Sequence, residues 1–420
     1  MRKELPESGT EWPTLRETML EYAGGDAQWR EGKLGVYIFH SGEEVMDVAH
    51  EAYGLFIAEN GLGPAAFPSL KRMESEVIQM ALSLQNAPEE AHGFMTSGGT
   101  ESILLAIKSC RDRAMSLGDT PGSQTSGGMN IVAPQSVHPA FDKGAHLMGL
   151  EVIRVPVGDD FCADVGAMAA AVNDETVMLV GSAPCFPYGV IDPIQELSDI
   201  AQERNLWLHV DACVGGYINP FIDRATGAPM RSHDFAIEGV CSMSLDLHKY
   251  GYAAKGASTV LYRTRELADH QAFDFDAWPC GRMYTPTFAG TRPGGAIAAA
   301  WGVMHFLGME GYVERAGEII ATRQKLVSGV EALGLQVFGD PVSSIVTFGW
   351  EGGDILAVGE GLYESGWFSS RVAKPDGIQL MISPEHSKII DNYLNLLEKL
   401  VQEVSTGQRV RRAGKVSYSG

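Results

Sequence analysis

Short apolar runs alternate with amphipathic stretches between residues 100 and 265. Six runs have the length and apolar content of strands: 131–134, 151–157, 176–183, 206–212, 241–247 and 258–263. Residues 163–173 and 194–205 carry apolar side chains at helical spacing, and Asp192-Pro193 supplies a cap and first turn for the second stretch. Apolar runs without strict alternation, joined by helices, are typical of parallel strands covered on both faces. The pattern therefore predicts an α/β domain whose ligands gather at the carboxyl ends of the strands.

The pattern changes after residue 310. A long helical stretch at 311–334 precedes two short strand-like pieces, 343–350 and 377–384, and a final helical stretch at 389–404. This order predicts a smaller α+β domain. The first sixty residues bury little on their own and are expected to dock on another surface. We therefore divide the chain into an N-terminal arm (1–60), a large domain (61–310) and a small C-terminal domain (311–420).

Composition limits the kinds of partner. The 420 residues include 53 acidic and 32 basic side chains, and the formal charge of −21 disfavours nucleic acid and anionic membranes. The sequence has neither a secretory signal nor an apolar run of the roughly 20 residues that cross a membrane. Its six cysteines are scattered singly, without the spacing of a zinc site. We expect a cytoplasmic protein without a structural metal.

The segment TSGGTES, residues 96–102, has the features of an anion site. Two glycines precede an amphipathic helix, so free backbone amides and the positive end of the helix dipole favour a phosphate there. The hydroxyls of Ser97 and Thr100 add donors. The alternative is a capping box between Ser97 and Glu101 that only starts the helix. No lysine of the Walker type follows, so nucleotide binding by that mode is not expected.

Two strand ends carry charged side chains that need partners. Asp211 ends one apolar run, where a buried carboxylate requires a metal, an arginine or a protonated ring nitrogen, unless it caps the following turn. Lys249 follows His248 after another run, and Lys255 lies nearby. Desolvation or a neighbouring cation lowers the pKa of a buried lysine, so that its uncharged amine can attack a carbonyl and form a Schiff base. The alternative for either lysine is an ordinary solvated charge at the surface.

The order of these groups along the chain matches the requirements of pyridoxal 5′-phosphate. Gly99 and Thr100 at the helix start would hold the phosphate, and the ring of His138 would stack on the pyridine. Asp211 would keep the pyridine nitrogen protonated, and Lys249 would form the Schiff base.

Several motifs resemble those of the sphingosine-1-phosphate lyases, within the family that includes glutamate and aromatic amino acid decarboxylases. The similar segments run from about Trp29 to about Glu314: TSGGTES, APQS-x-H, FPYGVIDP, HVDAC-x-GG, DLHKYGYA-x-KG and AGTRPGG. The resemblance implies a type I aminotransferase-like fold, in which the large domain has a mostly parallel seven-stranded sheet and the smaller C-terminal domain is α+β.

The resemblance also implies a reaction and a set of site residues. The substrate would be a phosphorylated long-chain amino alcohol, cleaved between C2 and C3 by a retro-aldol reaction to a fatty aldehyde and phosphoethanolamine. Tyr284 and Thr291 match a loop that reaches the neighbouring subunit's site, so a homodimer with shared sites is expected. The implied catalytic residues are Lys249, Lys255, Asp211 and Tyr188; the cofactor-binding residues are Gly99, Thr100, His138, Asp211, His248, Lys249 and Thr291; the substrate-binding residues are Tyr37, Asn60, Lys255 and Tyr284.

The chain departs from the lyase pattern at three places. The run Asn-Pro-Leu-His-Pro of the lyases is replaced by residues 60–64, NGLGP, so Gly63 stands where a histidine contacts the substrate phosphate. Leu247 replaces a threonine before His248, and Cys185 replaces a glutamine. These changes affect the predicted substrate more than the predicted cofactor.

Two other functions are compatible with the motifs. An amino acid decarboxylase on the same scaffold would need a cation, such as an arginine, over the departing carboxylate. A non-catalytic protein that binds pyridoxal phosphate or a sphingoid phosphate would not need Asp211, because that residue serves electron withdrawal. An assay for fatty aldehyde and for carbon dioxide separates the three.

Overall fold

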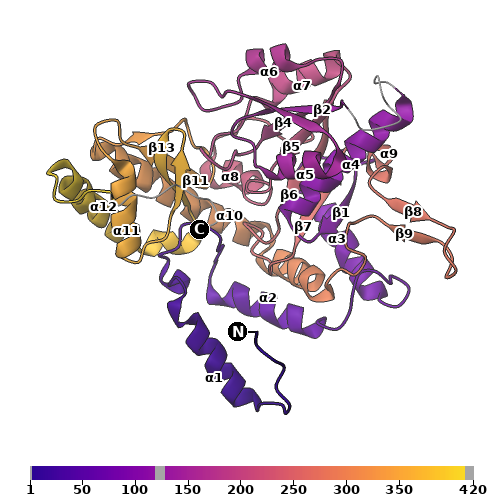
Figure 1. Cartoon of the computed structure of the whole chain (residues 1–420), viewed down its shortest axis with the longest axis horizontal. Coiled ribbons are helices and arrows are strands. Elements are labelled where there is room, and N and C mark those ends of the chain that lie inside the picture. The colour runs from indigo at the N-terminus through magenta and orange to yellow at the C-terminus, as the bar shows by residue number, and fades with distance from the viewer. Residues whose placement is uncertain (1, 119–127, 412–420) are drawn as a thin grey trace.

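A seven-stranded sheet forms the centre of the large domain in the computed structural model, which describes residues 2–118 and 128–411 (Figure 1). The strand order is β1-β7-β6-β5-β4-β2-β3. β7 runs antiparallel to β1 and β6, and the other neighbours are parallel, so the predicted mostly parallel sheet is confirmed. The strands are β1 (His92–Thr96), β2 (Asn130–Pro134), β3 (Glu151–Val155), β4 (Thr176–Ser182), β5 (Trp207–Asp211), β6 (Val240–Leu245) and β7 (Ser258–Tyr262).

Helices cover both faces of this sheet. Apolar side chains that alternate along β2 and β4 enter two separate cores, one formed with α4, α5 and α9 and the other with α3, α6 and α7. Every residue of β4, β5 and β7 is buried, as expected for strands covered on both sides. The covering helices are α3 (Pro68–Leu84), α4 (Gly99–Leu117), α5 (Ala140–Met148), α6 (Val165–Ala171), α7 (Ile194–Glu203) and α9 (Arg265–Asp269), with α8 (Asn219–Thr226) beside α10 (Gly294–Ala332).

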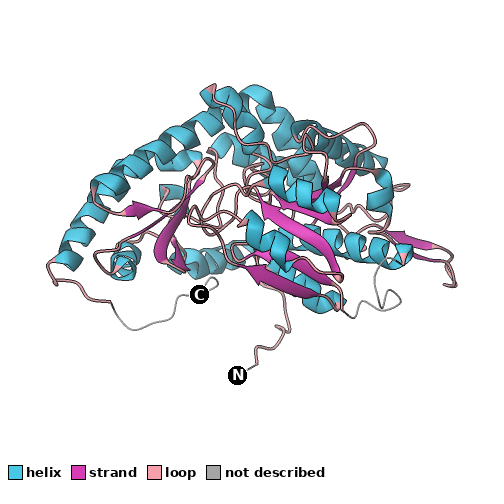
Figure 2. Ribbon diagram, turned by 90° about the horizontal axis from the view of Figure 1, so that it is seen from above, coloured by secondary structure: helices cyan, strands magenta, loops and turns pink. Residues whose placement is uncertain are grey.

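The long element α10 joins the large domain to the small one (Figure 2). It is interrupted at Gly308, whose φ of 56° lies outside the helical region, and the predicted boundary at residue 310 falls just beyond this break. The small domain contains an antiparallel sheet of order β10-β11-β13-β12. Its elements are β10 (Gln336–Val337), β11 (Ile345–Gly349), α11 (Ile355–Glu364), β12 (Ser370–Ala373), β13 (Asp376–Met381) and α12 (Ile390–Ser405).

The N-terminal segments contact both domains. Gly35 donates to the carbonyl of Phe368 at 2.8 Å and accepts from the amide of Met381 at 2.7 Å, which ties the chain to the small domain. α2 (Glu43–Leu55) packs along α10. By contrast, α1 (Trp12–Tyr22) buries no residue. It projects from the body, and so does the hairpin of β8 (Phe273–Phe275) and β9 (Met283–Thr285) (Figure 1). Over the described ranges, no helix is long and apolar enough to span a membrane.

Candidate active site

A cavity of about 540 Å³ lies at the carboxyl ends of the parallel strands. The turn after β1 supplies Ser97–Glu101, and the loop after β2 supplies His138. Asp211 is the last residue of β5, while the segment after β6 supplies Asp246, His248 and Lys249. Carboxyl ends of parallel strands meet at one edge of a sheet, so residues far apart in sequence converge here. This is the edge at which the sequence predicts a ligand site.

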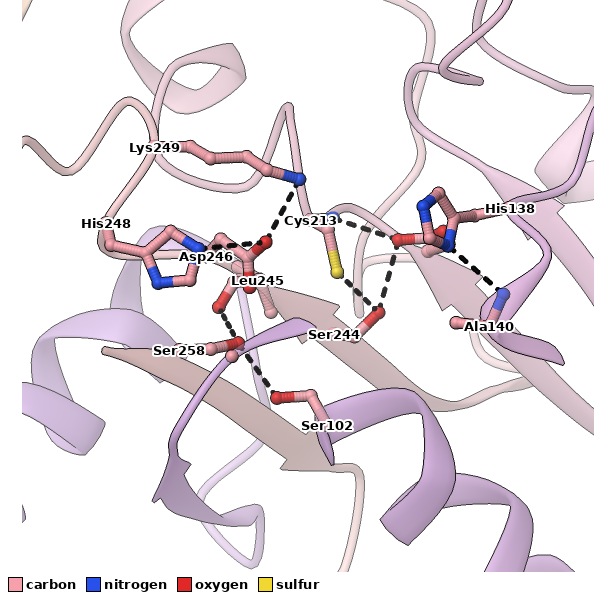
Figure 3. Close-up of polar contacts among 12 residues, drawn as sticks. Ser102, His138, Ala140, Cys213, Ser244, Leu245, Asp246, His248, Lys249 and Ser258 are labelled. Carbon is pink, nitrogen blue, oxygen red and sulfur yellow. Dashed lines mark hydrogen bonds and ion pairs between the residues drawn. The ribbon is translucent and has the colours of Figure 1, made fainter. Parts of the chain in front are cut away.

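Lys249 forms an ion pair inside this cavity (Figure 3). Its Nζ lies 3.0 Å from Oδ2 of Asp246, a carboxylate only 3% exposed. Burial lowers the pKa of Lys249, but Asp246 outweighs burial and holds that pKa above its ordinary value. Burial likewise raises the pKa of Asp246, and the charges of Lys249 and His248 bring it below the usual range. The prediction that Lys249 loses its charge easily is therefore wrong for this pair.

His138 lies on the opposite side of Cys213 from Lys249 (Figure 3), and Asp211 lines the same cavity. Oδ1 of Asp211 accepts from the amide of Cys213 at 3.1 Å and from the hydroxyl of Ser244 at 3.3 Å. The carboxylate thus caps the following turn while it lines the cavity. Burial lowers the pKa of His138 although Asp211 opposes this, and Nδ1 accepts from the amide of Ala140 at 3.2 Å. A neutral ring protonated on Nε2 follows, which suits stacking on an aromatic ligand.

The start of α4 keeps its first amides available. Oε2 of Glu101 accepts from the amide of Ser97 at 2.7 Å and from its hydroxyl at 2.6 Å. These bonds form one part of the capping box that the sequence offers as the alternative. No side chain caps the helix itself at Gly98. A Cβ on Gly99 would lie 2.7 Å from Sγ of Cys213, so only glycine fits. The uncapped helix start therefore retains the geometry of an anion site.

Lys255 lies at the mouth of the cavity. Its Nζ donates to the carbonyls of Tyr37 at 3.0 Å and His248 at 3.1 Å, and it stands 4.9 Å from the ring centre of Phe39. Desolvation and the charge of Lys249 lower the pKa of Lys255 to about 8. The pKa of Lys255 thus lies closer to neutral pH than the pKa of Lys249 does.

The residues of the cavity fit pyridoxal 5′-phosphate. The uncapped amides at Gly99 and Thr100 suit a phosphate. Nδ1 of His248 is buried without a hydrogen-bond partner in the described residues, so it can meet a ligand atom. Asp211 and Lys249 reach the same cavity and provide the carboxylate and the amine that this cofactor requires.

Three predicted residues lie outside the cavity of their own chain. Asn60 pairs with Pro293 in an isolated bridge, and its Oδ1 accepts from the amide of Leu62. Thr291 is exposed beside that bridge, and Tyr284 is 47% exposed on the projecting hairpin. Their predicted roles require a neighbouring subunit and stay predictions.

Tyr188 also lies outside the cavity. It is buried, and its hydroxyl donates to the carbonyl of Lys374 at 2.5 Å. This placement gives no support to its predicted catalytic role. Sequence reasoning missed Asp246 as the partner of Lys249, although an acid at a strand end carries the same signal that singled out Asp211.

Comparisons with known proteins agree with this geometry. The family model described as "Pyridoxal-dependent decarboxylase conserved domain" matches residues 25–348. The mouse protein named sphingosine-1-phosphate lyase 1 is 37% identical over 100% of this chain and 73% of its own length. The solved structure of the Burkholderia pseudomallei sphingosine-1-phosphate lyase has a TM-score of 0.91 at 34% identity, covering 97% of this chain and 94% of that one. A Methanosarcina barkeri protein named probable L-tyrosine/L-aspartate decarboxylase is 32% identical over 85% of this chain and 90% of its own length.

Proposed function

Because the chain belongs to the pyridoxal-dependent decarboxylase family and, within it, to the sphingosine-1-phosphate lyases, we propose that it cleaves sphingosine-1-phosphate or a related phosphorylated long-chain amino alcohol. The products are a fatty aldehyde and phosphoethanolamine. One observation carries the proposal: a single cavity joins Lys249, Asp211 and His138, with Lys255 at its mouth.

The cavity residues divide the work of binding the cofactor. The amides of Gly99 and Thr100 would hold the phosphate, and His138 would pack against the ring. Asp211 would keep a proton on the pyridine nitrogen, and Lys249 would provide the anchoring amine. When bound, pyridoxal 5′-phosphate supplies an aldehyde that combines with amines and a ring that withdraws electrons from a bond at Cα.

Lys255 is the group that we assign to the substrate hydroxyl. A base with a pKa of about 8 is partly uncharged at neutral pH and accepts protons efficiently there. As the C2–C3 bond of the substrate breaks, the hydroxyl on C3 gives its proton to Nζ of Lys255, and C3 becomes the aldehyde carbon. The electron pair of the broken bond stays on C2, where a proton completes phosphoethanolamine.

Amino acid decarboxylation is the second candidate, since one of the relatives is named a decarboxylase. That reaction needs a cation placed over the departing carboxylate. None of the described residues that line the cavity is an arginine, so no side chain of permanent positive charge faces this space. The available cations are Lys249, which is paired with Asp246, and Lys255. This favours the lyase.

A homodimer in the cytoplasm completes the proposal. The projecting α1 and the β8–β9 hairpin expose apolar side chains that a single chain leaves uncovered: Trp12, Leu15, Met19, Leu20, Tyr22, Phe273, Phe275, Met283 and Tyr284. A second copy would cover these side chains, and Tyr284 and Thr291 of one chain would then lie near the cavity of the other.

The six free thiols are compatible with a reducing compartment. Light scattering of the purified chain should give the mass of a dimer.

One assay tests the reaction. The purified protein, loaded with pyridoxal 5′-phosphate, is given sphingosine-1-phosphate and, separately, tyrosine, aspartate and glutamate. We expect fatty aldehyde from the lipid and its loss in Lys249→Ala. The matched control Lys325→Ala removes a surface lysine that pairs with Asp391 and should keep full activity. Carbon dioxide from an amino acid, with no aldehyde from the lipid, would refute the lyase assignment.

A further inference from the structure

Asp246 is the charged partner of Lys249, and neither the motifs nor the names of the relatives give it a role. It directly follows β6, and Oδ2 lies 3.0 Å from Nζ of Lys249. The carboxylate is almost completely buried, and Lys249, His248 and the hydroxyl of Ser258 together hold its pKa below the ordinary value. A buried carboxylate is sensitive to every charge placed beside it, so an anion bound next to Asp246 would change its protonation.

The same carboxylate lies against the start of α4. A Cβ built on Gly99 would be 2.8 Å from Oδ2 and 2.9 Å from Oδ1 of Asp246. Gly99 begins the helix whose uncapped amides are proposed to hold a phosphate. A carboxylate and a phosphate repel each other when they are neighbours in a buried site. A neutral carboxylic acid removes this repulsion and offers an O–H donor.

Lys249 faces the opposite requirement. An ammonium has no lone pair, so its nitrogen must lose a proton before it attacks an aldehyde carbon. The carboxylate 3.0 Å away is within hydrogen-bond reach of that proton. The titratable groups that face the pair are His248 on the same loop, Lys255 at the mouth of the cavity, and four residues of neighbouring elements: His138, Asp211, Cys213 and Tyr217.

We propose that Asp246 is the residue that accepts the proton of the Lys249 ammonium, so that the lysine is charged while it is free and uncharged when it reacts. The inference rests on the proposed function of this cavity. In the step, an N–H bond of Lys249 breaks, the proton forms an O–H bond on Oδ2, and nitrogen keeps the electron pair. The pair changes from two charges to none without exchanging a proton with solvent. Asp246 becomes neutral when an anion lies beside Gly99.

This mechanism has a distinctive dependence on pH. The reactive form, an uncharged lysine beside a neutral acid, contains the same number of protons as the ion pair. Its population therefore stays constant with pH while the pair is intact. If Lys249 instead loses its proton to solvent, the uncharged fraction rises about tenfold per pH unit below the pKa of the lysine.

The test measures the capture of pyridoxal 5′-phosphate by Lys249 in the full-length protein freed of cofactor. Mixtures between about pH 7 and about pH 9 are stopped with borohydride, and the modified peptide is quantified by mass spectrometry. We expect a nearly flat rate in the unchanged protein and a rise of about tenfold per pH unit in Asp246→Asn. Asp112→Asn, which removes the acid of the Lys108–Asp112 pair, is the matched control and should keep the flat profile.

Two results overturn the inference: a rate in the unchanged protein that climbs as steeply as in Asp246→Asn, or a flat profile in both. If Asp246→Asn does not fold, Asp246→Glu retains a carboxylate and should keep the flat profile at a lower rate, while a steep profile in that variant counts against the proposal. Capture needs no substrate. A protein with the expected profiles that releases no aldehyde would thus refute the proposed substrate and leave the role of Asp246 standing.

Discussion

Removal of Lys249 alone should destabilise the cofactor-free protein more than removal of Lys249 and Asp246 together. The two side chains are 23% and 3% exposed and lie 3.0 Å apart. Lys249→Ala leaves a buried carboxylate without its countercharge, a change that typically costs roughly 3–5 kcal/mol of unfolding free energy. The double variant Asp246→Asn with Lys249→Ala removes both charges and should recover most of that loss.

Urea unfolding, followed by circular dichroism, measures these differences. Lys325→Ala is the control, because its pair with Asp391 has side chains 49% and 71% exposed and should contribute about 0–1 kcal/mol. The reasoning is refuted if Lys249→Ala costs no more than this control, or if the double variant is as unstable as the single one.

The pH dependence of the same variants has a defined sign. In the unchanged protein the pKa of Asp246 is lowered, so the stability from the pair is present above the ordinary pKa of aspartate and is lost as pH falls through the lowered value. In Lys249→Ala burial dominates and should raise the pKa of Asp246. That variant should regain stability on acidification, because the carboxylate takes up a proton. The difference in unfolding free energy between Lys249→Ala and the unchanged protein should therefore become smaller as the pH falls.

Three further predictions concern catalysis. If Lys255 is the base, kcat/KM should fall about tenfold per pH unit as the pH drops below about 8. Lys255→Met should remove this dependence of kcat/KM on pH. A decline of kcat/KM above about pH 8 would instead show that the reaction needs the charged form of Lys255. Asp211→Ala should keep the visible absorbance of the bound cofactor but lose roughly a hundredfold or more in turnover, and full turnover would rule out its role at the ring nitrogen. Gly63→His should lower KM for the phosphorylated lipid, because it restores the histidine that contacts the substrate phosphate in the lyase pattern. The side chain has room, since a Cβ there meets only Ala66 at 3.8 Å. An unchanged KM would show that this segment does not contact the substrate.

The hydrophobic pattern was sufficient for much of the fold. Six apolar runs match β2 to β7 within two residues at each end, because fully buried strands leave a continuous apolar signal. β1, with the sequence HGFMT, lacks that signal, since it includes a histidine and a glycine and only part of it is fully buried. The part of α10 before residue 311 was not predicted, because residues 294–300 are all buried and leave no amphipathic period in the sequence.

The sequence by itself determined the residue types and their positions at strand ends, which are enough to predict the cofactor and to select Asp211 and Lys249. Only the tertiary structure decided which groups meet. The neighbouring strands β5 and β6 bring Ser244 to Asp211, and the turn after β1 brings Gly99 to Asp246. The charge of Lys249 depends on these approaches, because electrostatic interactions change steeply over a few ångströms in a buried site. Local sequence patterns specify elements, whereas distances between elements follow from the order of strands in the sheet.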